Sequence, residues 1–311
     1  MSRFYLGIDT SNYRTSAALF DAETGEWKNS GRLLEVPEGS LGLRQSDALF
    51  QHTLHLHEMI AGLPAGVKIH GVCVSTRPRA VEGSYMPCFL AGVNVARSIA
   101  HMLGVPLYEC SHQQGHLAAA ACSAKAMHLL SEEFYAWHLS GGTTELLHVL
   151  PGEHGLCHAE CIGGTTDLAA GQIVDRCGVL LGLPFPAGAY LEPLAEQSVA
   201  NDFFRPRVTE SKFSLSGVEN KFKKMHEEGA EPADIASFTL KTISSAVETA
   251  TSQALKQKKL PVLCAGGVMS NRMLQKRMKE KFGAKFAEPV LSGDNAVGAA
   301  ILAAMQNGEV F

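Results

Sequence analysis

The chain has eight cysteines but no CxxC pair, so it lacks the ligand spacing of a zinc finger. Single cysteines scattered through 311 residues indicate reduced, mostly buried thiols and a cytoplasmic protein. No apolar run reaches the roughly 18 residues of a membrane-spanning helix, so we expect no membrane contact. An acidic residue, Asp9, ends the first short apolar segment, and this excludes the apolar core of a signal peptide.

Two common hydrolase signatures are also missing. The stretch His57–Ala61 begins like the HExxH motif of zinc peptidases but ends in alanine. No GxSxG motif is present, so the sequence indicates no serine nucleophile on a strand-to-helix elbow. These absences disfavour a peptidase.

Charge is sparse and unevenly distributed. The formal net charge is −4, yet acidic residues outnumber basic ones in residues 1–200 and basic residues outnumber acidic ones in 201–311. The basic runs are Lys221/Lys223/Lys224, Lys256/Lys258/Lys259 and Lys276/Arg277/Lys279/Lys281. Such runs are typical of solvated helix faces, and they also suit contact with nucleic-acid phosphates.

A similar pattern occurs near the start of each half of the chain, which is long enough for two domains. Phe4–Asp9 and Thr15–Phe20 are apolar segments around a polar turn, and Trp137–Leu150 (WHLSGGTTELLHVL) reads as strand, Gly-rich tip and strand. This weak internal repeat predicts two similar domains. Their small, polar tips would let backbone N–H groups approach phosphate oxygens.

Helical and strand patterns alternate along the rest of the chain. Helices are predicted over 51–63, 88–103, 112–130, 168–181 and 233–257, and buried strands over 67–75 and 261–265. The second of these strands runs into Gly266-Gly267 and a helix from about Ser270, an arrangement that favours anion binding. A last helix is expected after LSGDNAVGAA, which places Asp294 near its N-terminus.

One histidine pair suggests a metal site. The stretch CSHQQGHLAAA places His112 and His116 four residues apart, on one face of a predicted helix. That spacing lets two imidazoles reach one ion. On this stretch alone, a chance pair is the more ordinary interpretation in a chain with 13 histidines, so a third ligand is needed to decide.

Taken together, the motifs resemble the tRNA threonylcarbamoyladenosine transferase family, which belongs to the actin/hexokinase/Hsp70-like (ASKHA) superfamily. The motifs are LGIDTSNYRTSAAL, SHQQGHLAAA, LSGGTTEL, TTDLAAGQIVDRCGVLLGLPFPAG, FSLSG, AGGVMSNRML and GDNAVGAA. The resemblance implies an α/β fold of two duplicated ASKHA domains, 1–133 and 134–311, with a nucleotide and metal cleft between them. The C-terminal helix is expected either within the second domain or packed back on the first.

The resemblance also implies a set of site residues. A divalent metal, iron or zinc in the family, would be held by His112, His116 and Asp294, while His52, His55 and His57 would be structural or surface residues. An adenine nucleotide or adenylate would be bound by Ser140, Gly141, Gly142, Thr143, Asp175, Gly188, Glu192 and Asn271. No covalent nucleophile, and thus no certain catalytic side chain, is implied.

The chain departs from the family pattern at several polar positions. Tyr13 and Arg14 stand where the family has an acidic pair, and Thr143 replaces a histidine near the ligand. The loop Arg77-Pro78-Arg79 replaces Gly-Pro-Gly, and Asp167–Gln172 reads DLAAGQ instead of DDAAGE. The added arginines Arg14, Arg77 and Arg79 suit contact with a phosphate or carboxylate.

These features lead to two classes of function. The first is a metal-dependent transferase that passes a threonylcarbamoyl group from threonylcarbamoyl-AMP to a tRNA adenosine beside the anticodon. The second is a divergent paralogue, which has either an altered acceptor or a nucleotide-binding or assembly role without tRNA-modifying activity. The intact metal motif favours the first and the lost acids favour the second. Expected partners are a nucleotide ligand, tRNA, and either sister subunits of the transfer machinery or a second copy of the chain.

Overall fold

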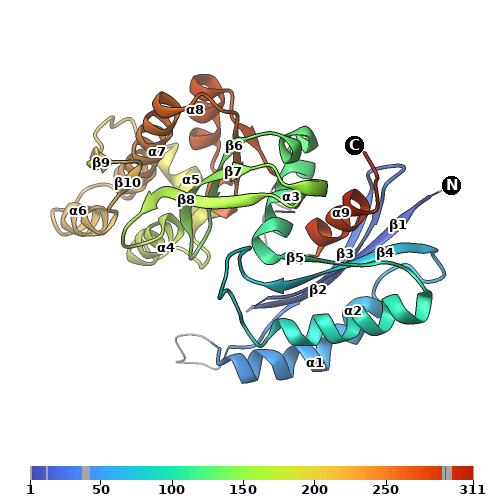
Figure 1. The fold of residues 1–311 in the computed structure, drawn as a ribbon. Coiled ribbons are helices and arrows are strands. Elements are labelled where there is room, and N and C mark those ends of the chain that lie inside the picture. Colours follow the sequence, from blue (N-terminus) through green and yellow to red (C-terminus); the bar gives the residue numbers. More distant parts are fainter. Residues whose placement is uncertain (1, 12, 37–42, 289–290, 292–295, 311) are drawn as a thin grey trace. The chain divides into compact units, whose positions relative to one another are not determined.

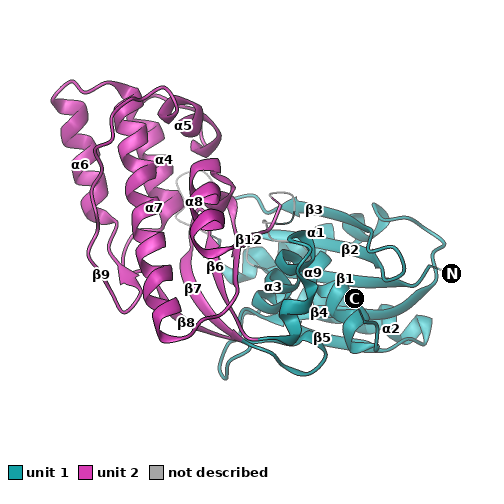
Figure 2. Ribbon diagram, turned by 90° about the horizontal axis from the view of Figure 1, so that it is seen from above, with its two compact units in different colours: residues 1–132, 150–158, 290–311 teal, residues 133–149, 159–289 magenta. Residues whose placement is uncertain are grey.

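Two β-sheets organise the chain, one in each of two compact units (Figures 1 and 2). The computed structural model describes residues 2–11, 13–36, 43–288, 291 and 296–310. Unit 1 comprises residues 1–132, 150–158 and 290–311, and unit 2 comprises residues 133–149 and 159–289.

The sheet of unit 1 has the strand order β3-β2-β1-β4-β5. Its strands are β1 (Phe4–Ser11), β2 (Arg14–Asp21), β3 (Trp27–Leu33), β4 (Ile69–Arg77) and β5 (Leu107–Ser111). The first three strands pair antiparallel, and β4 and β5 continue parallel to β1. The two strands of the hairpin predicted near the N-terminus are therefore confirmed.

Helices cover both faces of this sheet, which explains why β1 and β2 are buried along nearly their whole length (Figure 1). The helices α1 (Gln45–Ala61) and α2 (Phe89–Leu103) lie on one face, and α3 (His112–Ser123) and α9 (Val297–Gln306) lie on the other. The helix α9 consists mainly of small buried residues, so it can approach both the sheet and α3 closely.

The sheet of unit 2 repeats the same strand order. Five of its strands are β6 (Phe134–Leu139), β7 (Thr144–Leu150), β8 (His158–Thr165), β11 (Val262–Ala265) and β12 (Lys285–Phe286). They follow the order β8-β7-β6-β11-β12, and the short strands β10 (Lys212–Phe213) and β9 (Val208–Thr209) extend the β8 edge. The shared order confirms the predicted duplication of the fold.

The helices of unit 2 pack around one long central helix, α7 (Pro232–Gln257), which contacts all the others (Figure 2). These are α4 (Ala170–Leu180), α5 (Gly188–Ala195), α6 (Ser216–Glu227) and α8 (Arg272–Phe282). Most of α7 is buried, and its Thr251 Oγ1 accepts a 2.8 Å hydrogen bond from Trp137 Nε1 on β6. This bond satisfies the indole N–H inside the core.

Two predicted helix boundaries were wrong. The helix predicted over 112–130 ends at Ser123, because Lys125 adopts a left-handed conformation with φ 53° and a short 3-10 helix, Met127–Ser131, follows. The helix predicted from residue 51 already begins at Gln45. Local turn geometry, which hydrophobic periodicity does not report, decides the first of these boundaries.

All eight cysteines are free, and only Cys122 and Cys161 are not buried. The prediction of reduced, mostly buried thiols is therefore confirmed. None of the helices in the described part of the chain is long and apolar enough to cross a membrane.

Candidate functional site

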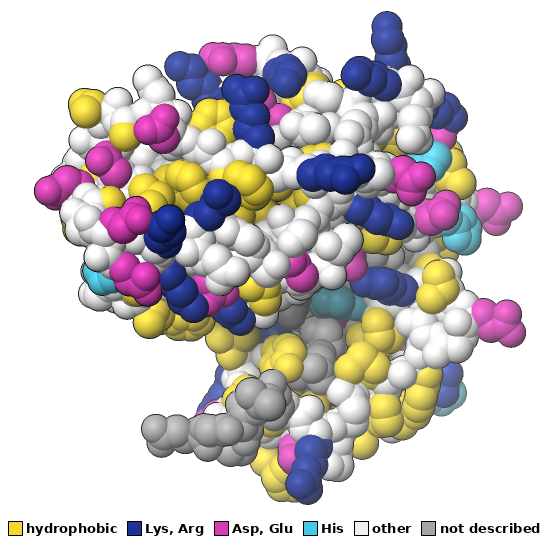
Figure 3. All heavy atoms as spheres, turned by 90° about the vertical axis from the view of Figure 1, so that its left-hand side faces the viewer, with side chains coloured by type: hydrophobic (Ala, Val, Ile, Leu, Met, Phe, Trp, Pro, Cys, Tyr) yellow, Lys and Arg dark blue, Asp and Glu magenta, His cyan; other side chains and the backbone are white. Residues whose placement is uncertain are grey.

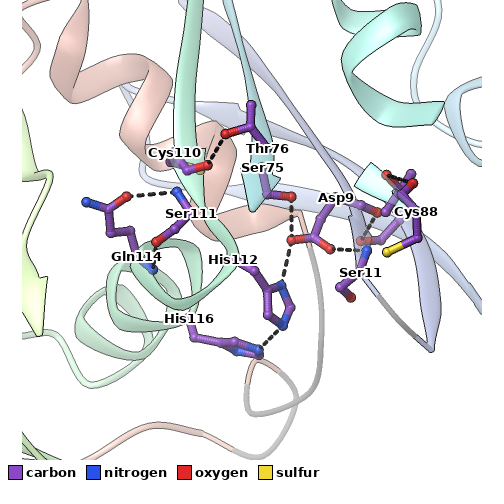
Figure 4. Close-up of polar contacts among 12 residues, drawn as sticks. Asp9, Ser11, Ser75, Thr76, Cys88, Cys110, Ser111, His112, Gln114 and His116 are labelled. Atoms are coloured by element: carbon purple, nitrogen blue, oxygen red, sulfur yellow. Dashed lines mark hydrogen bonds and ion pairs between the residues drawn. The ribbon is translucent and has the colours of Figure 1, made fainter. Parts of the chain in front are cut away.

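The two histidines of the HxxxH motif meet at the start of α3 (Figure 4). A capping box fixes this start: Ser111 Oγ accepts from the Gln114 N–H at 3.2 Å, and Gln114 Oε1 accepts from the Ser111 N–H at 2.8 Å. His112 is thus the first residue of the helix and His116 lies one turn later. Their Nε2 atoms are 2.9 Å apart.

A buried carboxylate holds the other nitrogen of His112. Asp9, at the end of β1, is 3% exposed, and its Oδ2 lies 2.7 Å from His112 Nδ1 (Figure 4). The same oxygen accepts a hydrogen bond from Ser75 Oγ at 2.8 Å, and Oδ1 accepts from the Ser11 N–H at 2.9 Å. The carboxylate is therefore fixed by β1 and β4, and it selects the His112 tautomer with the proton on Nδ1.

The histidine pair fits a divalent metal as two of its ligands. Imidazole nitrogens bind zinc at about 2.0–2.1 Å, and two nitrogens 2.9 Å apart can both lie at that distance from one ion. A ligand histidine commonly donates its other N–H to a carboxylate, as His112 does to Asp9. Among the described residues no group of three His, Cys, Asp or Glu is arranged to hold a metal, since Asp9 faces Nδ1 rather than the paired Nε2 atoms.

The expected third ligand, Asp294, lies outside the described residues. The helix that follows it is closely packed against α3. A Cβ atom added at Gly298, in the first turn of α9, would lie 1.8 Å from the carbonyl oxygen of Gly115. Only glycine at position 298 permits this approach, and Gly115 lies between the two histidines in the sequence.

The arginines and tyrosine that replace family residues lie in unit 1 on two stretches of chain, residues 13–14 and 77–79. Tyr13 is 43% exposed in the β1–β2 turn. Arg14 starts β2 on the sheet face that also carries Asp9, and its guanidinium lies against Gly31 of β3. The exposed Arg77 ends β4, where it pairs with Ser111, the residue before His112.

The loop around Arg79 is tied to α3. Pro78 accepts a 3.0 Å hydrogen bond from the Gln113 N–H, and the Arg79 N–H donates to Ser84 Oγ at 3.0 Å. The backbone of this loop thus lies beside the first turn of α3. Arg79 itself is exposed.

In unit 2, the predicted phosphate tip is the β6–β7 turn, Ser140–Thr143. The Ser140 N–H donates to the Thr143 carbonyl at 2.8 Å, and the Thr143 N–H donates to Ser140 Oγ at 3.2 Å. The next residue, Thr144, accepts a 2.8 Å hydrogen bond from the Ala170 N–H at the start of α4. The tip therefore lies beside a helix N-terminus, where backbone N–H groups favour an anion.

The glycine pair after β11 lies close to the end of β6. Gly266 has φ 102°, and a Cβ atom at this position would lie 2.1 Å from the Leu139 carbonyl oxygen. Both the positive φ and the contact require glycine. The turn that leads into α8 is thus held next to the residue that precedes Ser140.

The other predicted nucleotide residues make local hydrogen bonds at helix ends of unit 2. Asp175 Oδ1 accepts a 2.8 Å bond from the Ala187 N–H, just before Gly188 begins α5. Asn271 Oδ1 caps α8 by accepting from the Leu274 N–H at 3.0 Å. Glu192 Oε1 accepts a 2.5 Å bond from the Arg272 N–H, so α5 and α8 meet at the N-terminus of α8.

Sequence reasoning missed two contributors. The sequence marked Asp9 only as the acidic residue after the first apolar segment, and its bond to His112 spans about a hundred residues, which no local pattern reports. Thr144 is the second contributor, because its bond to Ala170 joins the tip to α4. An acidic residue within an otherwise apolar strand pattern was the available signal for Asp9.

Solved structures with a similar fold define the class of the chain. It matches full-length HypF in the phosphate- and nucleotide-bound form with TM-score 0.59 at 14% identity, covering 98% of this chain and 55% of that one. A ROK family glucokinase from Streptomyces griseus in complex with glucose and AMPPNP matches with TM-score 0.52 at 12% identity, covering 98% and 100%. The fold is the expected ASKHA type.

Sequence comparisons define the family. The family model TsaD, tRNA N6-adenosine threonylcarbamoyltransferase, matches residues 54–301. The transferase of that name from Rhizobium etli is 30% identical over 94% of this chain and 86% of its own length. The one from Geobacillus thermodenitrificans is 36% identical over 67% of this chain and 63% of its own length. The chain therefore belongs to the tRNA N6-adenosine threonylcarbamoyltransferase family.

Proposed function

We propose that this protein is a metal-dependent transferase that passes a threonylcarbamoyl group from threonylcarbamoyl-AMP to an adenosine of tRNA beside the anticodon. The observation that carries the proposal is the convergence of His112 and His116, with the buried carboxylate of Asp9 behind His112, in a chain of this family. Two imidazoles aimed at one point and supported by a carboxylate are the donor set of a metal site.

In this proposal His112, His116 and Asp294 hold one divalent ion, iron or zinc. When bound, such an ion acts as a Lewis acid that stabilises negative charge on the oxygens of a leaving group. Asp9 holds the His112 ring so that its Nε2 lone pair is available for the ion. Ser75 and the Ser11 N–H in turn hold Asp9, so neither the ring nor the carboxylate needs to reorganise.

The adenylate is proposed to bind to unit 2. The β6–β7 tip offers backbone N–H groups and Ser140 next to the N-terminus of α4, which suits phosphate oxygens. Asp175 and Glu192 provide carboxylates suited to sugar hydroxyls, and Gly188 leaves the start of α5 open. The amine of the acceptor adenosine attacks the carbamoyl carbon, the bond from this carbon to the AMP phosphate oxygen breaks, and the amine releases a proton to water as AMP leaves.

A second candidate function is transfer to a different acceptor. Arg14 favours this function. It places a cation on the same sheet face as Asp9, at a position where the family pattern has an acidic residue. A guanidinium cannot accept a proton from an attacking amine at neutral pH, whereas it readily binds an anionic acceptor. In this case Arg77 and Arg79 are further anion contacts.

A reconstitution assay separates the two functions. Purified protein loaded with iron or zinc is mixed with threonylcarbamoyl-AMP, unmodified tRNA and the partner subunits of the transfer machinery, and the digested tRNA is analysed by mass spectrometry. Threonylcarbamoyladenosine that disappears in Asp294→Ala supports the tRNA transferase. Absence of product, with metal and nucleotide still bound, overturns it and leaves the altered acceptor or a binding role.

A further inference from the structure

Three basic residues form a stripe on the outer face of α8. Arg272, Lys276 and Lys279 follow the spacing i, i+4 and i+7, so they share one side of the helix, and all three are exposed. No acidic residue in the described part of the chain forms an ion pair with them. Lys279 instead lies over the ring of Phe286, with 5.2 Å from Nζ to the ring centroid.

The remaining cations of α8 are used differently. Arg277 and Lys281 both bind the carboxylate of Glu248 on α7, which is largely buried. They therefore fasten α8 to the core of unit 2 and are not available to a partner. The helix thus divides its positive charge into a structural pair and an unpaired stripe.

Some basic residues elsewhere on unit 2 are neutralised by neighbours. Lys223 and Lys224 on α6 pair with Glu219 and Glu228, and Lys258 pairs with Glu133. On the face shown in Figure 3, Lys and Arg side chains likewise lie among Asp and Glu side chains. The stripe is distinguished because three exposed cations without an ion pair among the described residues share one face of a single helix.

Exposed aromatic rings lie on the segment that meets α8. Phe185 is 76% exposed in the loop before α5, and Tyr190 on α5 is 49% exposed. The hydrogen bond from the Arg272 N–H to Glu192 joins α5 to the first residue of the stripe. Exposed rings and unpaired cations on two joined elements are the combination that suits single-stranded nucleic acid, because bases stack on rings and phosphates meet cations.

We propose that the α5–α8 surface, formed by Phe185, Tyr190, Arg272, Lys276 and Lys279, binds the single-stranded loop of an RNA hairpin. The stripe contacts successive phosphates, and the two rings stack on unpaired bases. This inference rests on the proposed function, since it names the surface through which the tRNA acceptor is held. A paired RNA helix, whose bases are stacked inside, leaves the rings without a partner.

Binding measurements test the surface without any chemical step. Fluorescence anisotropy follows a labelled RNA hairpin with an anticodon-type loop, and a blunt RNA duplex of the same composition serves as the comparison. The triple variant Arg272→Gln/Lys276→Gln/Lys279→Gln should bind the hairpin about tenfold more weakly, with a slope of log K against log salt smaller by about 2, as expected for three lost phosphate contacts. The charge-matched control Lys224→Gln/Lys256→Gln/Lys259→Gln should stay within about twofold of wild type.

The two aromatic residues, Phe185 and Tyr190, are tested separately from the cations. Phe185→Ala and Tyr190→Ala should each weaken hairpin binding about fivefold to tenfold without changing the salt slope, and they should leave duplex binding unchanged. The control Tyr85→Ala removes a ring that is 63% exposed on unit 1 and should have no effect.

The outcomes distinguish a failure of the proposed RNA-binding surface from a failure of the proposed function. The proposed surface is overturned if both triple variants lose the same amount of hairpin affinity, or if the aromatic variants bind like wild type. The transferase proposal then depends on the reconstitution assay alone. A wild-type protein that binds no hairpin overturns the surface, and the reconstitution assay still decides the transferase proposal. Hairpin binding that depends on the stripe and the rings supports the surface even where no modified nucleoside forms.

Discussion

Asp9 Oδ2 and His112 Nδ1 lie 2.7 Å apart, and this contact joins the end of β1 to the first residue of α3. The contact is buried on the Asp9 side, and Ser75 and the Ser11 N–H hold the carboxylate from two strands. Because the carboxylate occupies Nδ1, it leaves Nε2 of His112 facing Nε2 of His116. Asp9 is therefore a positioning residue for the proposed metal site rather than a ligand.

Replacing this carboxylate should weaken metal binding without removing a ligand. We expect Asp9→Asn to lower the affinity for zinc by about tenfold to a hundredfold, the usual cost of losing a carboxylate behind a ligand histidine. Ser75→Ala should have a smaller effect in the same direction, because it loosens Asp9 only. Competition with a chromophoric chelator measures both affinities.

The control for this experiment is Asp21→Asn. Asp21 is also buried and also ends a strand of the same sheet, but it binds backbone N–H groups of Arg3 and Glu23. The Asp21→Asn protein should therefore be less stable than wild type but bind zinc with unchanged affinity. An Asp9→Asn protein that binds zinc like wild type would contradict the role given to Asp9.

The contact between α3 and α9 should tolerate no side chain at position 298. We expect Gly298→Ala to destabilise the protein by about 1–3 kcal/mol, the cost of overpacking, because the added Cβ would meet the Gly115 carbonyl oxygen. Urea unfolding followed by circular dichroism measures the change. In α6, Gly217 has open space around its Cβ position, so the matched variant Gly217→Ala should stabilise by up to about 1 kcal/mol.

The sequence carried enough information for the fold class because strands and turns recur in the same order in both halves. The hairpins at the start of each unit were predictable from alternating apolar segments around small polar tips. The α3 boundary was not, since a left-handed Lys125 ends the helix where the apolar pattern continues. The buried helix α9 shows little periodicity because it consists mainly of small residues that are buried on most sides.

The candidate site was only partly predictable for a similar reason. The spacing of His112 and His116 already placed both rings on one helix face, and the structure brings their Nε2 atoms together. The partner of His112 comes from a strand far away in sequence, so only the tertiary fold shows it. Arg14 was expected to face an anion, but its location against Gly31 depends on the pairing of β2 with β3.

Substitutions of Asp175 should distinguish the role of its charge in nucleotide binding from its hydrogen bond to the loop before α5. Its Oδ1 accepts from the Ala187 N–H, a bond that the side-chain oxygen of asparagine can also accept. We therefore expect Asp175→Asn to keep the fold and weaken AMP binding about tenfold through the lost bond to a sugar hydroxyl, and Asp175→Ala to weaken it further. Isothermal titration calorimetry with AMP measures this, and unchanged affinity in both variants would exclude Asp175 from the site.

His52 should make the protein sensitive to mild acid. It is fully buried on α1, where its Nδ1 lies 2.8 Å from Thr15 Oγ1, and burial lowers its pKa from 6.5 to about 4. Between these two values the unfolded chain binds a proton that the folded chain does not, so stability falls as the pH drops through 6.5 towards 4. The full shift corresponds to about 3 kcal/mol. Urea midpoints at pH 7.5 and pH 4.5 should therefore differ more for wild type than for His52→Gln, which has no titrating group at this position. Equal differences in the two proteins would show that other groups cause the acid sensitivity.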